Sequence, residues 1–174
     1  MRVFVTGGTG LIGSALVAEL LGHGHTVLAL ARSGSSAMAV ETAGAESIRG
    51  DLADLSTLRA GAAKADGVIH LAFANDFSSP AALAAAVAEE GAALAALGEE
   101  LIDSGRPLIT VSGTPYVPGR ASTEADPLPT DGPVGVAAAR SRRSWTWPPA
   151  ESGARPSACR ARSTTRAGAD SPAC

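Results

Sequence analysis

The sequence predicts an α/β protein built on a doubly wound parallel sheet. Three observations predict this fold: apolar runs typical of buried strands recur along residues 1–111, segments with helical spacing separate them, and a glycine-rich stretch follows the first run. Strands that alternate with helices favour right-handed crossovers, which predicts the strand order 3-2-1-4-5. The length of 174 residues suits one domain with a sizeable core.

The glycine-rich stretch Thr6–Gly13 connects the first predicted strand to the first predicted helix. Gly7 permits a tight turn, Gly10 lets the backbone approach a phosphate, and Gly13 allows close packing of the helix on the strand. This arrangement gathers backbone N–H groups at a helix N-terminus, which favours an anion such as a dinucleotide pyrophosphate. The alternative is a glycine-rich turn in an unrelated α/β protein.

The segment Val5-Thr6-Gly7-Gly8-Thr9-Gly10-Leu11-Ile12-Gly13 resembles the extended short-chain dehydrogenase/reductase family of NAD(P)-dependent epimerases, dehydratases and dehydrogenases. The resemblance extends from residue 1 to about residue 131. It implies a Rossmann-type NAD(P)-binding domain, which we assign to residues 1–135. The implied cofactor contacts in this segment are Gly7, Thr9, Gly10, Leu11, Ile12 and Gly13.

The end of the second predicted strand, residues 26–31, favours NADP over NAD. An acidic residue there would bind the adenosine ribose, whereas this chain has Arg32 and Ser33. A guanidinium and a hydroxyl suit a 2′-phosphate. The alternative is that Arg32 is only a solvated residue at a strand end.

Two further strand ends contribute predicted cofactor contacts. The third predicted strand, residues 47–52, ends in Gly50-Asp51-Leu52. The family resemblance implies that Asp51 holds the adenine amino group and that Leu52 covers the ring, and a turn or helix cap is the structural alternative for Asp51. The fourth predicted strand, residues 67–72, contains His70, which we interpret as a packed or hydrogen-bonded core residue. The resemblance places the inner ribose against Leu71, Ala72 and Phe73.

Helical spacing predicts two long helices. One carries Ile12, Leu16 and Leu20, and the other begins at Ser79-Pro80 and ends before Gly105. The buried stripe predicted for the second helix is Leu83, Val87, Leu94, Leu97 and Leu101.

The fifth predicted strand, residues 108–111, leads to a candidate catalytic residue. Ser112 matches the serine that contacts substrate in the family. The family pairs this serine with a Tyr-x-x-x-Lys motif, in which the lysine lowers the pKa of the tyrosine. The only tyrosine here is Tyr116 and the only lysine is Lys64, so the usual proton relay is absent.

Composition excludes several other classes of function. The net charge of −3 gives no reason to expect nucleic acid or an anionic membrane as a partner. We expect no apolar run to approach the ~20 residues of a membrane span. Cys159 and Cys174 lack the spacing of a disulfide framework or a zinc site, so no metal is predicted. A chain that begins with a strand predicts no secretory signal, and we expect a cytoplasmic protein.

Residues 136–174 form a low-complexity tail rich in Arg, Ala, Ser and Pro, for which composition predicts disorder. A basic nucleic-acid tail is one interpretation. We favour another, in which the tail is read in the wrong frame of a GC-rich gene. Read one base earlier, the codons of Trp145-Thr146-Trp147-Pro148 encode Leu/Val/Met, Asp, Leu/Val/Met and Ala, a helix-compatible run.

The sequence leaves two functions open. One is the nucleotide-binding portion of an NAD(P)-dependent oxidoreductase or epimerase without turnover, and the other is a non-catalytic NADP-sensing module. Whether the protein is an enzyme, which substrate it uses and its oligomeric state are not specified by these residues.

Overall fold

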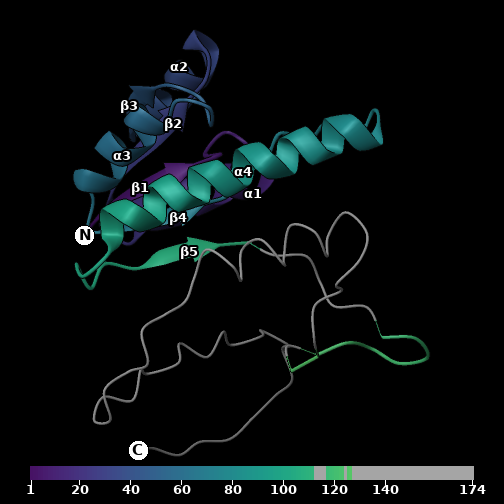
Figure 1. Cartoon of the computed structure of the whole chain (residues 1–174). Helices are drawn as coiled ribbons and strands as arrows, with labels where there is room; N and C mark the ends of the chain where they lie inside the picture. Colours follow the sequence, from purple (N-terminus) through teal and green to yellow (C-terminus); the bar gives the residue numbers. More distant parts are fainter. Residues whose placement is uncertain (112–116, 124, 127–174) are drawn as a thin grey trace, which may run out of the picture.

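The computed structural model describes residues 1–111, 117–123 and 125–126. Its centre is a five-stranded parallel sheet with the strand order β3-β2-β1-β4-β5, as the sequence predicts (Figure 1). The first strand, β1, is the central one, and its Val5 pairs with Ala29 on one side and Ile69 on the other. The strands are β1 (Arg2–Thr6), β2 (Thr26–Ala31), β3 (Glu46–Arg49), β4 (Gly67–His70) and β5 (Leu108–Thr110).

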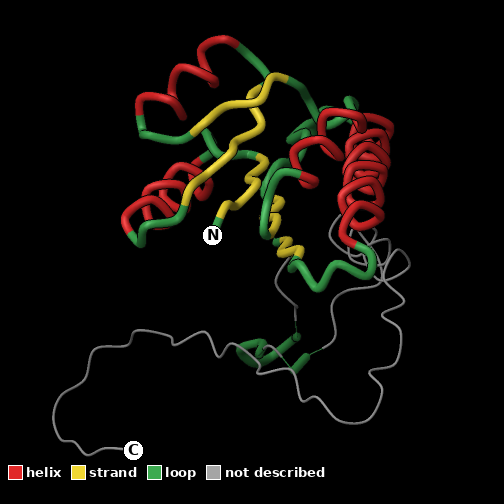
Figure 2. The backbone as a smooth tube through the Cα atoms, turned by 90° about the vertical axis from the view of Figure 1, so that its left-hand side faces the viewer, coloured by secondary structure: helices red, strands yellow, loops and turns green. Residues whose placement is uncertain are grey.

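Four helices cover the two faces of the sheet, as Figure 2 shows from the side. Alternate side chains of a strand point to opposite faces, so the core is divided into two layers. Val5 packs in the cluster that holds Val17 of α1, whereas Phe4 packs in the cluster that holds Leu58 of α3 and Leu97 of α4. The helices are α1 (Leu11–Gly22), α2 (Gly34–Thr42), α3 (Leu55–Ala63) and α4 (Pro80–Leu101).

Side-chain caps fix the start of three helices. Ser33 caps α2, Asp54 caps α3 and Ser79 caps α4, each accepting a hydrogen bond from a backbone N–H of the first turn. Pro80 occupies the first turn of α4, where its missing N–H costs nothing. The first helix is the exception, because Gly10 at its N-cap has no side chain to accept such a bond.

The structure differs from the sequence analysis in three of its elements. The helix α2 was not predicted, although Ser33 and the buried Ala37 and Val40 give it a cap and an inner face. The third strand ends at Arg49 rather than at residue 52, because the chain turns away from the sheet towards the cap of α3. On α1, Ile12 is exposed, and the inner face is formed by Gly13 and Val17 with Leu16 and Leu20 at its margin.

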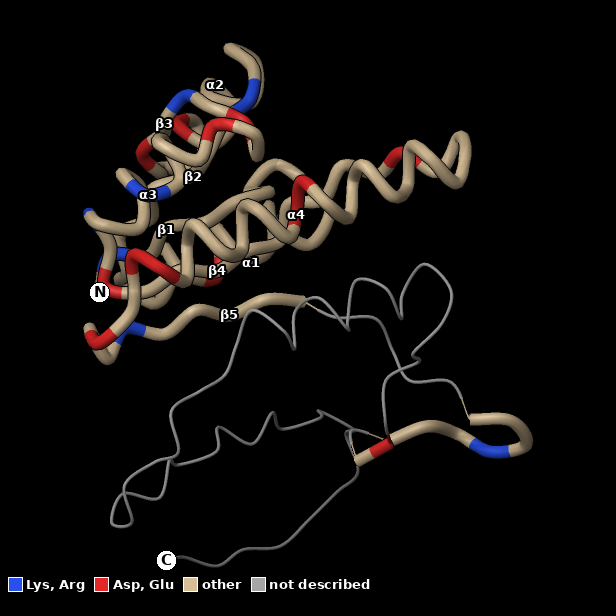
Figure 3. The backbone as a smooth tube through the Cα atoms, in the orientation of Figure 1, with Lys and Arg blue, Asp and Glu red and all other residues tan. Residues whose placement is uncertain are grey.

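The long helix α4 corrects the expectation about apolar runs. By length and composition its 22 residues could cross a membrane, since alanines raise the hydropathy around Glu89 and Glu90. One such helix is weak support for a membrane span, because a core helix has the same composition. Val87, Leu94, Leu97 and Leu101 of the predicted stripe are buried, and the last two pack in the cluster that holds Phe4 of the sheet. Figure 3 shows acidic positions along the helix.

Candidate functional site

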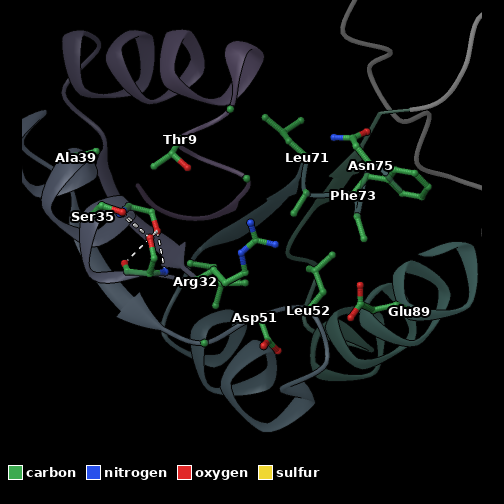
Figure 4. Close-up of a pocket in the computed structure, with 18 residues that line it drawn as sticks. Thr9, Arg32, Ser35, Ala39, Asp51, Leu52, Leu71, Phe73, Asn75 and Glu89 are labelled. Atoms are coloured by element: carbon green, nitrogen blue, oxygen red, sulfur yellow. Dashed lines mark hydrogen bonds between the residues drawn. The ribbon is translucent and has the colours of Figure 1, made fainter. Parts of the chain in front are cut away.

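A cleft of about 720 Å³ opens at the carboxyl ends of the strands, where doubly wound sheets bind their ligands (Figure 4). It lies between the glycine-rich turn after β1, the start of α2, the loop after β3 and the loop after β4. Ten of the residues predicted from the sequence line this cleft: Gly7, Thr9, Gly10, Arg32, Ser33, Asp51, Leu52, Leu71, Ala72 and Phe73.

The glycine-rich turn is held by close backbone contacts. Gly7 has a φ of +73°, a conformation that side chains with a Cβ rarely adopt, and its carbonyl accepts a hydrogen bond from the Gly10 N–H at 3.0 Å. A Cβ on Gly13 would overlap with the Gly7 carbonyl oxygen, so only glycine lets α1 approach the turn this closely. The predicted roles of Gly7 and Gly13 in the turn and its packing therefore agree with the geometry.

Within the described residues, no side chain caps the N-terminus of α1 at this turn. Its N-cap, Gly10, supplies no side-chain acceptor, and no acidic residue lies in the first turn of the helix. The first N–H groups of a helix carry a partial positive charge and bind anions. Leu11 and Ile12 are 93% and 64% exposed and lie outside the cleft lining, so any contact they make with a ligand would involve their backbone.

Arg32 extends from the end of β2 into the middle of the cleft (Figure 4). Its carbonyl accepts a hydrogen bond from Arg49 Nη2 at 3.2 Å, which fixes the backbone from which the side chain projects. The Ser33 hydroxyl accepts from the Ser36 N–H at 3.1 Å and lies 2.8 Å from the Ser35 hydroxyl. The Ser33 hydroxyl is therefore engaged as the cap of α2. Ser33, Ser35 and Ser36 together form a polar rim of the cleft beside Arg32.

Asp51 combines the two roles that the sequence leaves open. It lines the cleft, and its Oδ1 accepts hydrogen bonds from the Ala53 and Asp54 N–H groups at 3.0 and 3.1 Å. The carboxylate is turned towards the start of α3 (Figure 4). The turn that was the structural alternative for Asp51 is therefore present, while Oδ2 makes no hydrogen bond within the described residues.

The end of β4 is joined to the end of β1 by a buried polar pair. Thr6 and His70 face each other in the strand register, and Thr6 Oγ1 lies 2.8 Å from His70 Nδ1. The same hydroxyl oxygen accepts hydrogen bonds from the Leu71 and Ala72 N–H groups at 3.2 and 3.3 Å. The interpretation of His70 as a hydrogen-bonded core residue is confirmed by its exposure of 1%.

Burial lowers the pKa of His70 from its ordinary value of 6.5 to about 4. As the pH falls, the unfolded chain therefore takes up this proton before the folded chain does, and stability is lost. We expect the contribution of the neutral His70 to the free energy of unfolding to be fully present at pH values well above 6.5. This contribution should fall by about 2 kcal/mol between pH 7 and pH 5, before most carboxylates titrate.

Urea unfolding at pH 7 and pH 5 measures this loss. The variant His70→Asn has no titrating group at this position and provides the control, so its stability should change much less across the same interval. An equal pH dependence in both proteins would contradict a neutral, buried His70.

Sequence reasoning missed several residues of the lining. Ser35 and Ser36 could have been found from their position at a capped helix start, and Ala74 and Asn75 from their place directly after Phe73. Glu89 carries no local signal, because the fold brings α4 to the cleft. The additional lining residues are Leu30, Ser35, Ser36, Ala39, Gly50, Ala74, Asn75 and Glu89.

Some predicted residues lie elsewhere. Gly13 is buried behind the glycine-rich turn rather than in the lining. Ser112 and Tyr116, and the proposed boundary between residues 135 and 136, lie outside the described residues. Among the described residues, no group of three or more His, Cys, Asp or Glu side chains could hold a metal ion.

A parallel sheet of this strand order, with a glycine-rich first turn at the mouth of its cleft, defines the Rossmann class of fold. The model of the NAD dependent epimerase/dehydratase family matches residues 3–135, well over half of the chain. The chain belongs to this family.

Individual relatives agree with this membership. An uncharacterised protein of Schizosaccharomyces pombe is 43% identical over 131 residues, which cover 74% of this chain and 43% of that protein. The chain therefore spans less than half the length of this curated relative.

Two solved structures share the fold. The UDP-glucose 4-epimerase of Bifidobacterium longum, in complex with NAD+ and UDP, superimposes with a TM-score of 0.68 at 24% identity, covering 83% of this chain and 48% of the epimerase. A short-chain dehydrogenase/reductase superfamily protein of Agrobacterium tumefaciens with bound NAD gives a TM-score of 0.65 at 24% identity, covering 83% and 44%.

Proposed function

We propose that the chain binds a nicotinamide dinucleotide in the cleft and prefers NADP to NAD. The observation that carries this proposal is the meeting of two anion-binding features in one cleft: the uncapped N-terminus of α1 and the guanidinium of Arg32. A dinucleotide with a 2′-phosphate carries negative charge at both places, as its pyrophosphate and as its ribose phosphate.

The pyrophosphate fits the glycine-rich turn. Thr9 and Gly10 line the cleft directly before α1, and the contacts of Gly13 with the Gly7 carbonyl hold this turn close to the helix. Backbone N–H groups there would donate to the phosphate oxygens without a competing side-chain acceptor. We assign the contacts of Leu11 and Ile12 to their backbone.

The 2′-phosphate fits the space beside Arg32. A guanidinium binds phosphate through two parallel hydrogen bonds, and the hydroxyls of Ser33 and Ser35 lie on the same wall of the cleft. We assign the first contact to Arg32 and the second to Ser35, since the Ser33 hydroxyl already accepts the N–H of Ser36.

The remaining parts of the dinucleotide fit the other strand ends. Asp51 and Leu52 border the region where the family holds adenine, and Oδ2 of Asp51 would accept the amino group. Leu71, Ala72 and Phe73 line the far wall, where the inner ribose would lie. The Bifidobacterium and Agrobacterium structures contain bound NAD, which supports a dinucleotide as the ligand of this fold.

We further propose that the chain as given does not turn over a substrate. The Tyr-x-x-x-Lys motif is absent from the sequence, and Lys64 lies at the C-terminus of α3 before β4, at the edge of the sheet opposite the cleft. This absence also favours the second candidate, a non-catalytic NADP-sensing module. A partner protein that binds only in the presence of NADPH would identify a sensor.

Exchange of Arg32 for aspartate tests the cofactor preference. Loss of a charge-assisted hydrogen bond costs about 2 kcal/mol, so Arg32→Asp is expected to weaken NADPH binding about 30-fold. The affinity for NADH should be unchanged or higher, because a carboxylate can accept the ribose 2′-hydroxyl. Fluorescence titration of the full chain with both dinucleotides measures the two affinities.

Arg59→Asp is the matched control, since it makes the same change of charge where Arg59 of α3 pairs with Glu99 of α4, away from the cleft lining. It should leave both affinities unchanged. Equal affinities of the unmodified chain for NADPH and NADH would remove the assignment of Arg32 to a 2′-phosphate.

A further inference from the structure

The two fully buried polar side chains among the described residues, Thr6 and His70, form one hydrogen-bonded pair directly behind the cleft. The pair connects elements 64 residues apart in the sequence, the ends of β1 and β4. Neither side chain lines the cleft, yet each is followed by residues that do: Gly7 after Thr6, and Leu71 and Ala72 after His70.

The hydrogen bonds around Thr6 favour one protonation state of His70. Thr6 Oγ1 accepts the Ala72 N–H at 3.3 Å and shares the Leu71 N–H with the Thr6 carbonyl oxygen, each at 3.2 Å, so the hydroxyl hydrogen of Thr6 is free to donate. The nearest acceptor is His70 Nδ1 at 2.8 Å, which accepts this hydrogen only if Nδ1 carries no proton. This geometry favours a neutral imidazole with its proton on Nε2.

The second ring nitrogen of His70 lowers the stability of the fold instead of raising it. His70 Nε2 is buried and has no hydrogen-bond partner within the described part of the chain. A buried, unpaired donor costs free energy, which an apolar side chain of similar size would avoid. The feature that distinguishes histidine from an apolar residue here is the acceptor Nδ1.

The pair lies beside a close backbone contact at the wall of the cleft. A Cβ on Gly7 would lie 2.8 Å from the Ala72 nitrogen and 2.9 Å from the Leu71 carbonyl carbon, so the turn and the end of β4 touch through their backbones. Thr6 Oγ1 accepts hydrogen bonds from the N–H groups of the same two residues, which directly follow β4. Loss of the hydrogen bond from the Thr6 hydroxyl to His70 Nδ1 would free this hydroxyl to rotate and would loosen the hydrogen bonds that it accepts from the Leu71 and Ala72 N–H groups.

We propose that His70 is a positioning residue for the dinucleotide. In its Nε2–H form it accepts the Thr6 hydroxyl, orients that oxygen towards the Leu71 and Ala72 N–H groups, and so holds the wall of the cleft against the glycine-rich turn. The inference rests on the proposed function, because the affinity that it sets is the affinity for NADPH.

The first test compares His70→Leu with His70→Asn in the full chain. Leucine keeps the apolar bulk without an acceptor, whereas the asparagine side-chain oxygen can replace Nδ1. We expect about 10-fold weaker NADPH binding for His70→Leu and an affinity within about 3-fold of the original for His70→Asn. Thr6→Val should resemble His70→Leu, and the double variant should lose no more than either single variant.

The second test needs no cofactor. Nitrogen NMR of the histidine ring reports the tautomer, and amide hydrogen exchange reports the protection of Leu71 and Ala72. We expect the proton on Nε2, and faster exchange of both amides in His70→Leu but not in His70→Asn.

The outcomes separate this inference from the proposed function. A proton on Nδ1, or unchanged amide protection in His70→Leu, overturns the role of His70 whether or not the chain binds NADPH. Unchanged NADPH affinity in His70→Leu overturns it as well. Faster exchange in His70→Leu, together with an unmodified chain that binds no dinucleotide, refutes the proposed function and with it the role of His70 in affinity.

Discussion

Replacing Gly13 with alanine is expected to weaken NADPH binding by at least about 100-fold, or about 2.8 kcal/mol. The new Cβ would overlap with the carbonyl oxygen of Gly7, a backbone atom that cannot move by a simple rotamer change. The first turn of α1 must then separate from the glycine-rich turn, and the N–H groups that face the pyrophosphate lose their position. Titration with NADPH measures the loss.

The matched control lies in the same helix. Gly22, the last residue of α1, has no atom within 4 Å of a built Cβ, so Gly22→Ala should be neutral or stabilise the helix by up to about 1 kcal/mol. If Gly13→Ala bound NADPH as well as Gly22→Ala does, the glycine-rich turn would not be the pyrophosphate site.

Phe4→Ala is expected to lower the free energy of unfolding by about 4 kcal/mol. The ring is fully buried in the cluster between the sheet and the helices α3 and α4, and α3 contacts it through Gly61. A Cβ on Gly61 would already overlap with the ring, so the packing is tight and removal of the ring leaves a cavity. Urea unfolding at pH 7 measures the difference.

Met38→Ala is the control for this prediction, because Met38 is 68% exposed on α2 and its loss should change stability by less than about 0.5 kcal/mol. A loss below about 1 kcal/mol for Phe4→Ala would contradict a core centred on this residue. The protein aromatic content is only 3%, so few other rings could replace this packing.

The strand order and the glycine-rich turn were predictable because they depend on local signals. Apolar runs such as Val27–Leu30 have few alternatives to a buried parallel strand, and the crossover rule then limits the topology. Gly7 and Gly13 occupy positions where a Cβ would collide with backbone, so their spacing alone indicated the geometry.

Elements whose signals are weak or divided were harder to predict. The helix α2 has only Ala37 and Val40 on its inner face, and a short, mostly exposed helix leaves little periodicity. Asp51 was predicted from the family resemblance as an adenine ligand, yet its hydrogen bonds to Ala53 and Asp54 form a turn that sequence reasoning held as the alternative.

Contacts between distant segments were beyond the sequence. Nothing near Glu89 indicates that α4 brings it to the cleft, and nothing near His70 indicates that its partner is Thr6. Both follow from the pairing of β1 with β4 and from the packing of α4, which only the folded chain defines.

Calorimetric titration of the full chain with NADPH and with NADH tests the central proposal most directly. One binding site per chain is predicted, with tighter binding of NADPH, because the uncapped start of α1 and Arg32 meet in one cleft. Binding of neither dinucleotide by a folded chain would contradict the proposal.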